Sequence, residues 1–116
     1  MNLNKVVIDI KDSDYIMAFD MSSVDYFNKM YPQKNFMDVI THIYKLDYFS
    51  IAVFFAITLR RKEEPNKIIT LEEFNNINIL LLTNNYLDEV FKIINSSFEE
   101  DKKSRKKKVK QVAKKI

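Results

Sequence analysis

The chain has 116 residues, with no cysteine, no glycine, a single histidine and a formal net charge of +3. This length is typical of one domain that buries its own hydrophobic core. The absence of cysteine excludes disulfides and cysteine nucleophiles, and the absence of glycine excludes the usual phosphate-binding loops and nucleophile elbows. Polar residues at positions 2, 4 and 5 interrupt any apolar leader, so we expect a cytoplasmic protein.

The charge is divided unevenly along the chain. Residues 102–116 contain nine lysines and arginines and no acid, whereas the preceding 101 residues contain 10 basic and 16 acidic residues, a net charge of −6. Apolar residues become rare after residue 98. We therefore expect a single helical domain over residues 1–98 and a charged, disordered basic tail over residues 99–116.

Residues 3–19 show the alternation that is typical of a β-hairpin. Every second residue is apolar on both sides of a turn at residues 11–14: Val6, Ile8 and Ile10 before it, and Tyr15, Met17 and Phe19 after it. Asp and Ser side chains in the turn can supply the local hydrogen bonds that replace glycine. Two strands alone are marginally stable, so the hairpin must pack against helices or pair with another sheet edge.

Two amphipathic helices are predicted next. Asp20 or Ser22 can cap the first, which turns Val24 and Phe27 inward and ends at Pro32. Asn35 can cap the second, whose apolar residues recur at helical spacing: Phe36, Val39, Ile40, Ile43 and Tyr44.

The most apolar part of the chain is the segment of residues 48–61. Residues 51–59 leave no polar stripe at helical spacing, so a helix here is apolar on every side. Asp47 or Ser50 can cap its start, and the cations of residues 60–62 are expected in its last turn. It is too short to cross a bilayer, which needs roughly 20 residues. Either the domain covers this helix all round, or a second protein covers one side.

Two further helices follow a loop at residues 63–67. Thr70 and Glu73 form a capping-box pattern, in which the Thr70 hydroxyl accepts from the backbone N–H of Glu73 and the Glu73 carboxylate accepts from the backbone N–H of Thr70. The helix that they open is expected to bury one face of Phe74, Ile77, Leu80 and Leu81, and Asn84 and Asn85 interrupt it. The last helix carries the apolar stripe of Leu87, Val90, Phe91, Ile94 and Phe98. The predicted fold is mainly α with a small N-terminal β-hairpin (α+β), a compact bundle of four to five helices.

The sequence contains no recognisable catalytic motif. Its adjacent acid pairs, at residues 63–64, 72–73 and 99–100, point in different directions and fit loop, cap and tail positions. His42 follows Asp38 by one helical turn, as in an exposed ion pair. We therefore expect no enzyme, no cofactor and no metal site. An alternative is a nucleic-acid-associated regulatory protein whose basic tail contacts phosphates, although that tail has no aromatic residue to stack on bases.

Aromatic side chains are abundant, with nine Phe and six Tyr. Tyrosine suits contact surfaces because its ring buries area while its hydroxyl stays hydrated. The aromatic residues near helix ends, and those on faces that the periodicity does not assign to the core, are either parts of a compact monomer or contacts with a partner. The candidate partner-binding residues are Tyr44, Tyr48, Phe54, Phe55 and Tyr86.

The order of these elements resembles that of phage tail assembly chaperones. The resemblance covers roughly residues 5–98 and rests on the hairpin, the Asp20-Met21-Ser22 start of a short aromatic helix, the amphipathic and apolar helices, and the box of residues 70–73. Such chaperones are small proteins encoded beside the tape-measure gene of long-tailed phages, prophages and phage-tail-like bacteriocins. The resemblance implies a non-enzymatic cytoplasmic protein that self-associates, in some members as a spiral. It also implies binding to the tape-measure protein until tail-tube subunits replace the chaperone, without any membrane.

Overall fold

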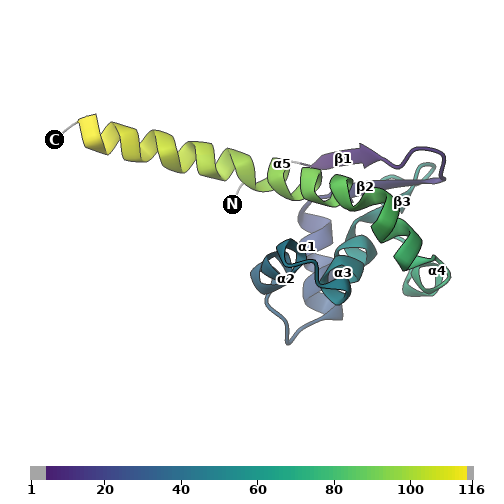
Figure 1. Ribbon diagram of the computed structural model, residues 1–116. Helices are drawn as coiled ribbons and strands as arrows, with labels where there is room; N and C mark the ends of the chain where they lie inside the picture. Colours follow the sequence, from purple (N-terminus) through teal and green to yellow (C-terminus); the bar gives the residue numbers. More distant parts are fainter. Residues whose placement is uncertain (1–4, 115–116) are drawn as a thin grey trace.

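The computed structural model describes the backbone of residues 5–114 and the side chains of residues 5–97. This part of the chain forms three strands and five helices, which confirms the predicted α+β class (Figure 1). In order they are β1 (Val6–Asp9), β2 (Tyr15–Phe19), α1 (Met21–Met30), α2 (Phe36–Tyr44), α3 (Tyr48–Thr58), β3 (Leu59–Arg61), α4 (Leu71–Asn75) and α5 (Ile79–Lys114).

The predicted N-terminal hairpin is present as β1 and β2. The strands pair antiparallel, with Val6 opposite Phe19 and Asp9 opposite Ile16. Asp12 takes a φ of 61° in the turn, a conformation that Asp tolerates better than most residues. The Ser13 hydroxyl donates to the carbonyl of Ile10 at 2.8 Å, so polar side chains support this turn without glycine.

The sheet has a third strand where the sequence predicted the end of the central helix. α3 ends at Thr58, and Leu59 turns to extended backbone with φ −67° and ψ 133°. β3 then pairs antiparallel with β2, placing Arg61 opposite Tyr15, so the sheet order is β1-β2-β3. The prediction that the arginines lie in the last helical turn is therefore wrong. Pairing with β2 satisfies the backbone N–H and C=O groups of β3. This pairing joins segments that are far apart in the sequence, so helical periodicity cannot predict it.

The caps of α1 and α2 lie where local sequence signals are strongest. Asp20, and not Ser22, is the N-cap of α1. Its side chain accepts from the backbone N–H of Ser23, and the Ser23 hydroxyl accepts from the backbone N–H of Asp20. The Asn35 side chain accepts from the first backbone N–H groups of α2, as predicted. Both helices bury one face, which includes Phe27 of α1 and, on α2, Val39, Ile40 and Ile43.

α3 is the centre of the core. Asp47 caps it by accepting from the backbone N–H of Ser50 at 3.0 Å. From Ile51 onward its large side chains are almost entirely buried, and it contacts β2, α1, α2 and α5. The Phe54 ring stacks on Phe19 of the sheet at a centroid distance of 5.7 Å. The surrounding elements of the same chain thus cover α3 on all sides beyond its first turn.

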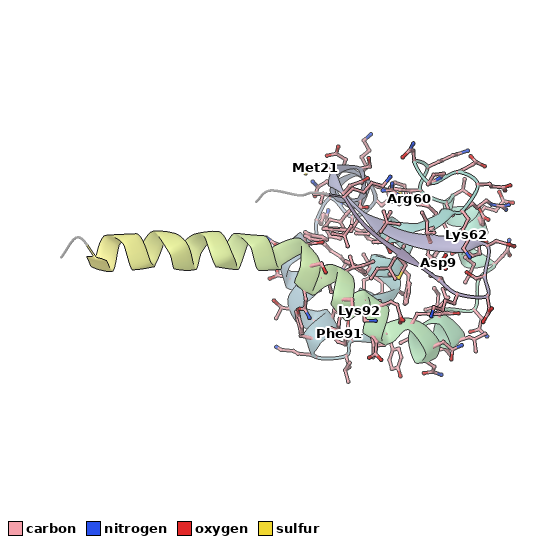
Figure 2. All side chains as sticks on the ribbon, turned by 90° about the horizontal axis from the view of Figure 1, so that it is seen from above. Asp9, Met21, Arg60, Lys62, Phe91 and Lys92 are labelled. Atoms are coloured by element: carbon pink, nitrogen blue, oxygen red, sulfur yellow. The ribbon has the colours of Figure 1, made fainter. Side chains whose placement is uncertain are left out.

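A buried arginine joins the sheet to α1. Arg60 is 1% exposed, and its guanidinium donates to the two carboxylate oxygens of Asp20 at 2.8 and 3.2 Å and to the carbonyl of Pro65 at 3.1 Å. Burial alone would raise the pKa of Asp20, but the hydrogen bonds and charge of Arg60 outweigh it and hold that pKa below its ordinary value. Figure 2 shows Arg60 between Met21, the first residue of α1, and the exposed pair of Lys62 and Asp9, whose charged atoms are 3.1 Å apart.

The sequence predicted one helix that buries a face from Phe74 to Leu81, but the structure divides this stretch between α4 and α5. The Thr70 hydroxyl accepts from the N–H of Glu73 as expected, but the Glu73 carboxylate binds Arg61 and the Tyr15 hydroxyl instead of returning to the cap. α4 ends after five residues, and the side chains of Leu80 and Leu81, predicted to be buried, are 64% and 57% exposed. Leu80 and Leu81 are therefore surface residues.

α5 bends at Tyr86, whose φ of −128° and ψ of 19° break the helix one residue beyond Asn85. After the bend, Val90, Ile93 and Ile94 are buried against the core. The helix then continues to Lys114 and leads away from the globule (Figure 1). The predicted stripe residue Phe98 and the side chains of the basic tail lie outside the described residues. The division into a domain and a disordered tail stays a prediction.

Candidate partner-binding surface

The turn between α2 and α3 exposes several apolar side chains, and we call residues 44–49 the α2–α3 corner. α2 ends in a Schellman motif, in which the N–H of Asp47 bonds to the carbonyl of His42 and the N–H of Leu46 bonds to that of Ile43. Glycine usually occupies the position of Leu46, which here has a φ of 61°. This conformation costs an L-residue roughly 1–2 kcal/mol. The corner thus holds a strained leucine at the surface.

Four large side chains of the corner face solvent over half or more of their area. Tyr44, Leu46, Tyr48 and Phe49 are 51–57% exposed. The Tyr44 ring packs on Phe91 of α5 at a centroid distance of 5.4 Å. Its hydroxyl donates to the side-chain oxygen of Asn95 at 2.8 Å, which fixes this end of the corner to α5. The corner is therefore anchored while its apolar surface remains accessible.

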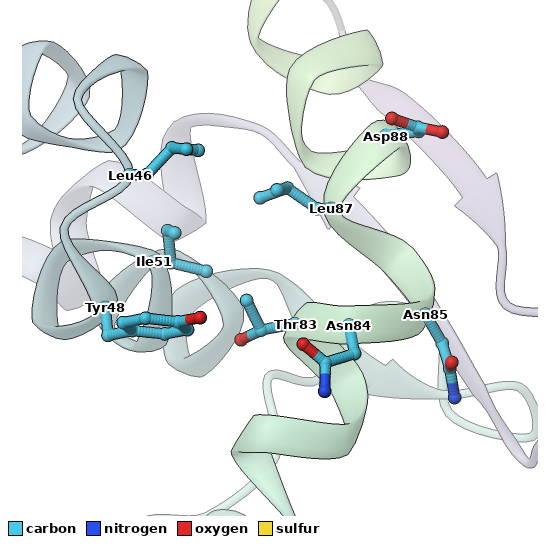
Figure 3. Close-up of a pocket in the computed structure, with 8 residues that line it drawn as sticks. All are labelled: Leu46, Tyr48, Ile51, Thr83, Asn84, Asn85, Leu87 and Asp88. Carbon is cyan, nitrogen blue, oxygen red and sulfur yellow. The ribbon is translucent and has the colours of Figure 1, made fainter.

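A groove separates the corner from the bend in α5. Its volume is about 280 Å³, and its lining consists of Leu46, Tyr48, Ile51, Thr83, Asn84, Asn85, Leu87 and Asp88. Figure 3 shows Leu46 and Leu87 pointing toward each other from opposite sides. Leu46, Tyr48 and Ile51 form one wall, and the α5 wall combines Leu87 with amide, hydroxyl and carboxylate groups. Leu80 precedes Asn84 by four residues on the same helix. This exposed leucine therefore lies one helical turn beyond the α5 wall of the groove.

A second hollow, of about 320 Å³, lies beside the same corner. Phe49 and Asp47 line it together with polar residues of α2 and of the preceding loop, among them Asp38 and His42. The Lys34 ammonium lies 4.7 Å from the centre of the Phe49 ring, a cation–π contact. Hydrogen bonds from the hydroxyl and the backbone N–H of Ser50 lower the pKa of Asp47. Alternate residues of the corner thus line two different hollows.

The five predicted partner-binding residues fall into two groups. Tyr44 and Tyr48 lie in the corner, and Tyr86 is half-buried at the bend of α5, where its hydroxyl donates to the carbonyl of Lys11 at 3.1 Å. Phe54 and Phe55 are fully buried in α3. In this fold those two phenylalanines contact the core of their own chain, so they do not form part of the accessible surface.

Sequence reasoning missed three residues of the exposed apolar surface, Leu46, Phe49 and Leu80. Leu46 and Phe49 belong to no apolar stripe, but four large apolar residues among six consecutive positions at a helix junction are a signal in the sequence. Helical spacing from Ile77 predicts Leu80 in the core. The early end of α4 removes that continuity. The full extent of the exposed apolar surface is thus visible only in the folded chain.

The candidate metal ligands among the described residues are the single histidine and the acidic side chains. His42 Nδ1 lies 2.6 Å from the backbone carbonyl of Asp38, and not beside its carboxylate as the helical spacing suggested. Within residues 5–97, no cluster of three or more His, Cys, Asp or Glu side chains is arranged to hold a metal ion. Nor is any helix in the described part of the chain long and apolar enough to span a bilayer.

Comparisons with known proteins add no relative. The chain matches no protein family, no curated protein and no solved structure.

Proposed function

We propose that this protein is a non-enzymatic tail assembly chaperone that self-associates and binds the tape-measure protein, keeping it soluble during assembly of a phage tail or a tail-like particle. The exposed apolar surface of the α2–α3 corner is the observation that carries this proposal. Contiguous apolar side chains at the surface of a small domain typically mark a site of protein–protein contact. Those of the corner lie within six consecutive residues.

The geometry of the corner suits an apolar helical segment. Helix-binding grooves hold one or two side chains of a partner's apolar face, with polar groups at the rim. The groove of about 280 Å³ has an apolar wall at Leu46, Tyr48 and Ile51 and a mostly polar wall on α5. Tyrosine and phenylalanine at the corner can bury large areas with little loss of side-chain freedom. A long tape-measure protein with many apolar helical segments is the client that the sequence resemblance supplies.

Co-expression with a tape-measure protein, the client that the resemblance implies, tests the proposal. We expect the chaperone to increase the soluble fraction of that protein and to co-purify with it. Unchanged solubility of the client and no co-purification would refute the proposed function. Binding to nucleic acid that weakens steeply between about 50 and 200 mM salt would instead favour the regulatory alternative.

A pair of matched substitutions tests whether the corner is the contact. Phe49→Ser should reduce co-purification of the client, because it removes an aromatic side chain that is 54% exposed at the corner. Met21→Ser is the control, since Met21 is 53% exposed on α1. Both changes are at the surface and should alter stability by less than about 0.5 kcal/mol. Equal effects of the two variants would place the client elsewhere.

A further inference from the structure

The lining of the groove contains one charged residue, Asp88, which is exposed, and no lysine or arginine. Lys45 precedes Leu46 in the corner and Lys92 follows Asp88 by one helical turn, but neither lines the groove. Residues 1–101 as a whole have a net charge of −6. The lining is therefore acidic, in a part of the chain that is acidic overall.

The complementary charge is at the other end of α5. Residues 102–116 contain nine basic residues and no acid. Four of the fifteen are apolar, and in the sequence Val109, Val112, Ala113 and Ile116 are spaced i, i+3, i+4 and i+7, as in a narrow amphipathic stripe. A groove with one apolar wall and a carboxylate at its rim matches this combination of small apolar residues and lysines.

The same helix prevents a copy from filling its own groove. Asp88 and Val109 both lie on α5, and 21 residues at 1.5 Å each separate them by about 31 Å along the axis. Figure 1 shows this half of α5 leading away from the globule. While α5 is helical over this length, the basic segment cannot reach the groove of its own chain.

We propose that the basic C-terminal segment of one copy, residues 102–116, docks in the groove between the α2–α3 corner and the α5 bend of a second copy. Such a contact joins two different surfaces, so it continues from copy to copy or closes into a ring. Electrostatic attraction guides the approach, and salt screens it. This inference rests on the self-association in the proposed function and deepens it; because the client is proposed to use the same groove, the tail of a second copy and the client compete for it.

Two full-length variants with complementary defects test the contact. Asp88→Lys disables the groove and keeps the tail. A quadruple variant, with Lys106, Lys107, Lys108 and Lys110 each changed to Gln, weakens the tail and keeps the groove. By analytical ultracentrifugation, wild type should self-associate at about 50 mM salt and dissociate toward 1 M, where the Debye length is only about 3 Å. Each variant alone should associate at least tenfold more weakly, because Asp88→Lys puts like charges at the contact and the quadruple variant removes four of the nine basic charges of the tail.

Mixing the two variants should restore a complex of one copy of each, which neither forms alone. This result also shows that both variants are folded. Asp25→Lys makes the same charge change at an exposed position of α1, and it should self-associate as the wild type does. A monomeric wild type at low salt, or a mixture that forms no complex, would overturn the proposal.

Client binding provides the separate readout. If Asp88→Lys lowers tape-measure binding and leaves self-association unchanged, the groove holds the client and the proposed contact is refuted. If both charge variants weaken self-association and their mixture restores it, but no client binds, the contact between copies is supported and the chaperone function is refuted.

Discussion

Asp20→Asn is the most informative single substitution in the core, because Asp20 has two roles that this change separates. Its carboxylate caps α1 by accepting from the N–H of Ser23, and it also pairs with Arg60, whose side chain is 1% exposed. Asparagine caps helices about as well as aspartate. The substitution therefore keeps the cap and removes only the charge opposite the buried guanidinium.

The expected cost follows from the burial of the two partners. Removing one member of a buried ion pair costs about 3–5 kcal/mol, because the other charge is left unpaired. The Asp20 side chain is 19% exposed, and the carbonyl of Pro65 remains a partner of Arg60, so we expect the lower end, about 3 kcal/mol. Asp20→Ala loses the cap as well and should cost about 1 kcal/mol more.

Urea unfolding measures these differences. With an m-value of about 2 kcal/mol/M, Asp20→Asn should lower the midpoint by roughly 1.5 M without a change in m. Asp47→Ala is the matched control, since Asp47 caps α3 at the surface with a similar bond of 3.0 Å and has no buried cation. It should cost about 1 kcal/mol. Adding Arg60→Met to Asp20→Asn should recover most of the lost stability.

An Asp20→Asn variant that is no less stable than Asp47→Ala would refute this reasoning. It would mean that Arg60 is adequately solvated or paired without the carboxylate, and that the connection between the sheet and α1 depends on packing alone.

Three further predictions concern the core, the tail and acid. Phe54→Asp should abolish cooperative thermal unfolding, because an unpaired carboxylate at a fully buried site costs on the order of the whole stability of a small domain; a soluble variant with an unchanged melting temperature would contradict this. Deleting residues 102–116 should leave the urea midpoint unchanged, since these residues contain few apolar side chains; loss of the cooperative transition would contradict it. The pKa values of Asp20, Asp47 and Glu73 are lowered by folding, so their stabilisation is complete above the unfolded pKa of about 4 and is lost as the pH falls below it. The urea midpoint should therefore be lower at pH 3 than at pH 6, and Asp20→Asn should reduce that difference.

Local signals in the sequence were sufficient to locate most of the elements. The caps at Asn35, Asp47 and Thr70 act within three residues of themselves. Asn35 and Thr70 were predicted at their observed positions, and Asp47 was one of two predicted caps of α3. The hairpin of residues 3–19 and the apolar helix α3 follow from periodicity, which depends only on backbone geometry. These features were predictable because the interactions that define them span at most a few residues.

The third strand, the buried arginine and the exposed corner were decided by tertiary structure. Residues 59–61 continue an apolar helix in the sequence, and only pairing with β2 makes them a strand. Arg60 can be buried because Asp20, 40 residues earlier, reaches it. Phe54 is covered from several elements, whereas Leu46 is left at the surface by a positive φ. Burial depends on which segments meet in space, and composition and periodicity do not specify contacts between residues that are far apart in the sequence.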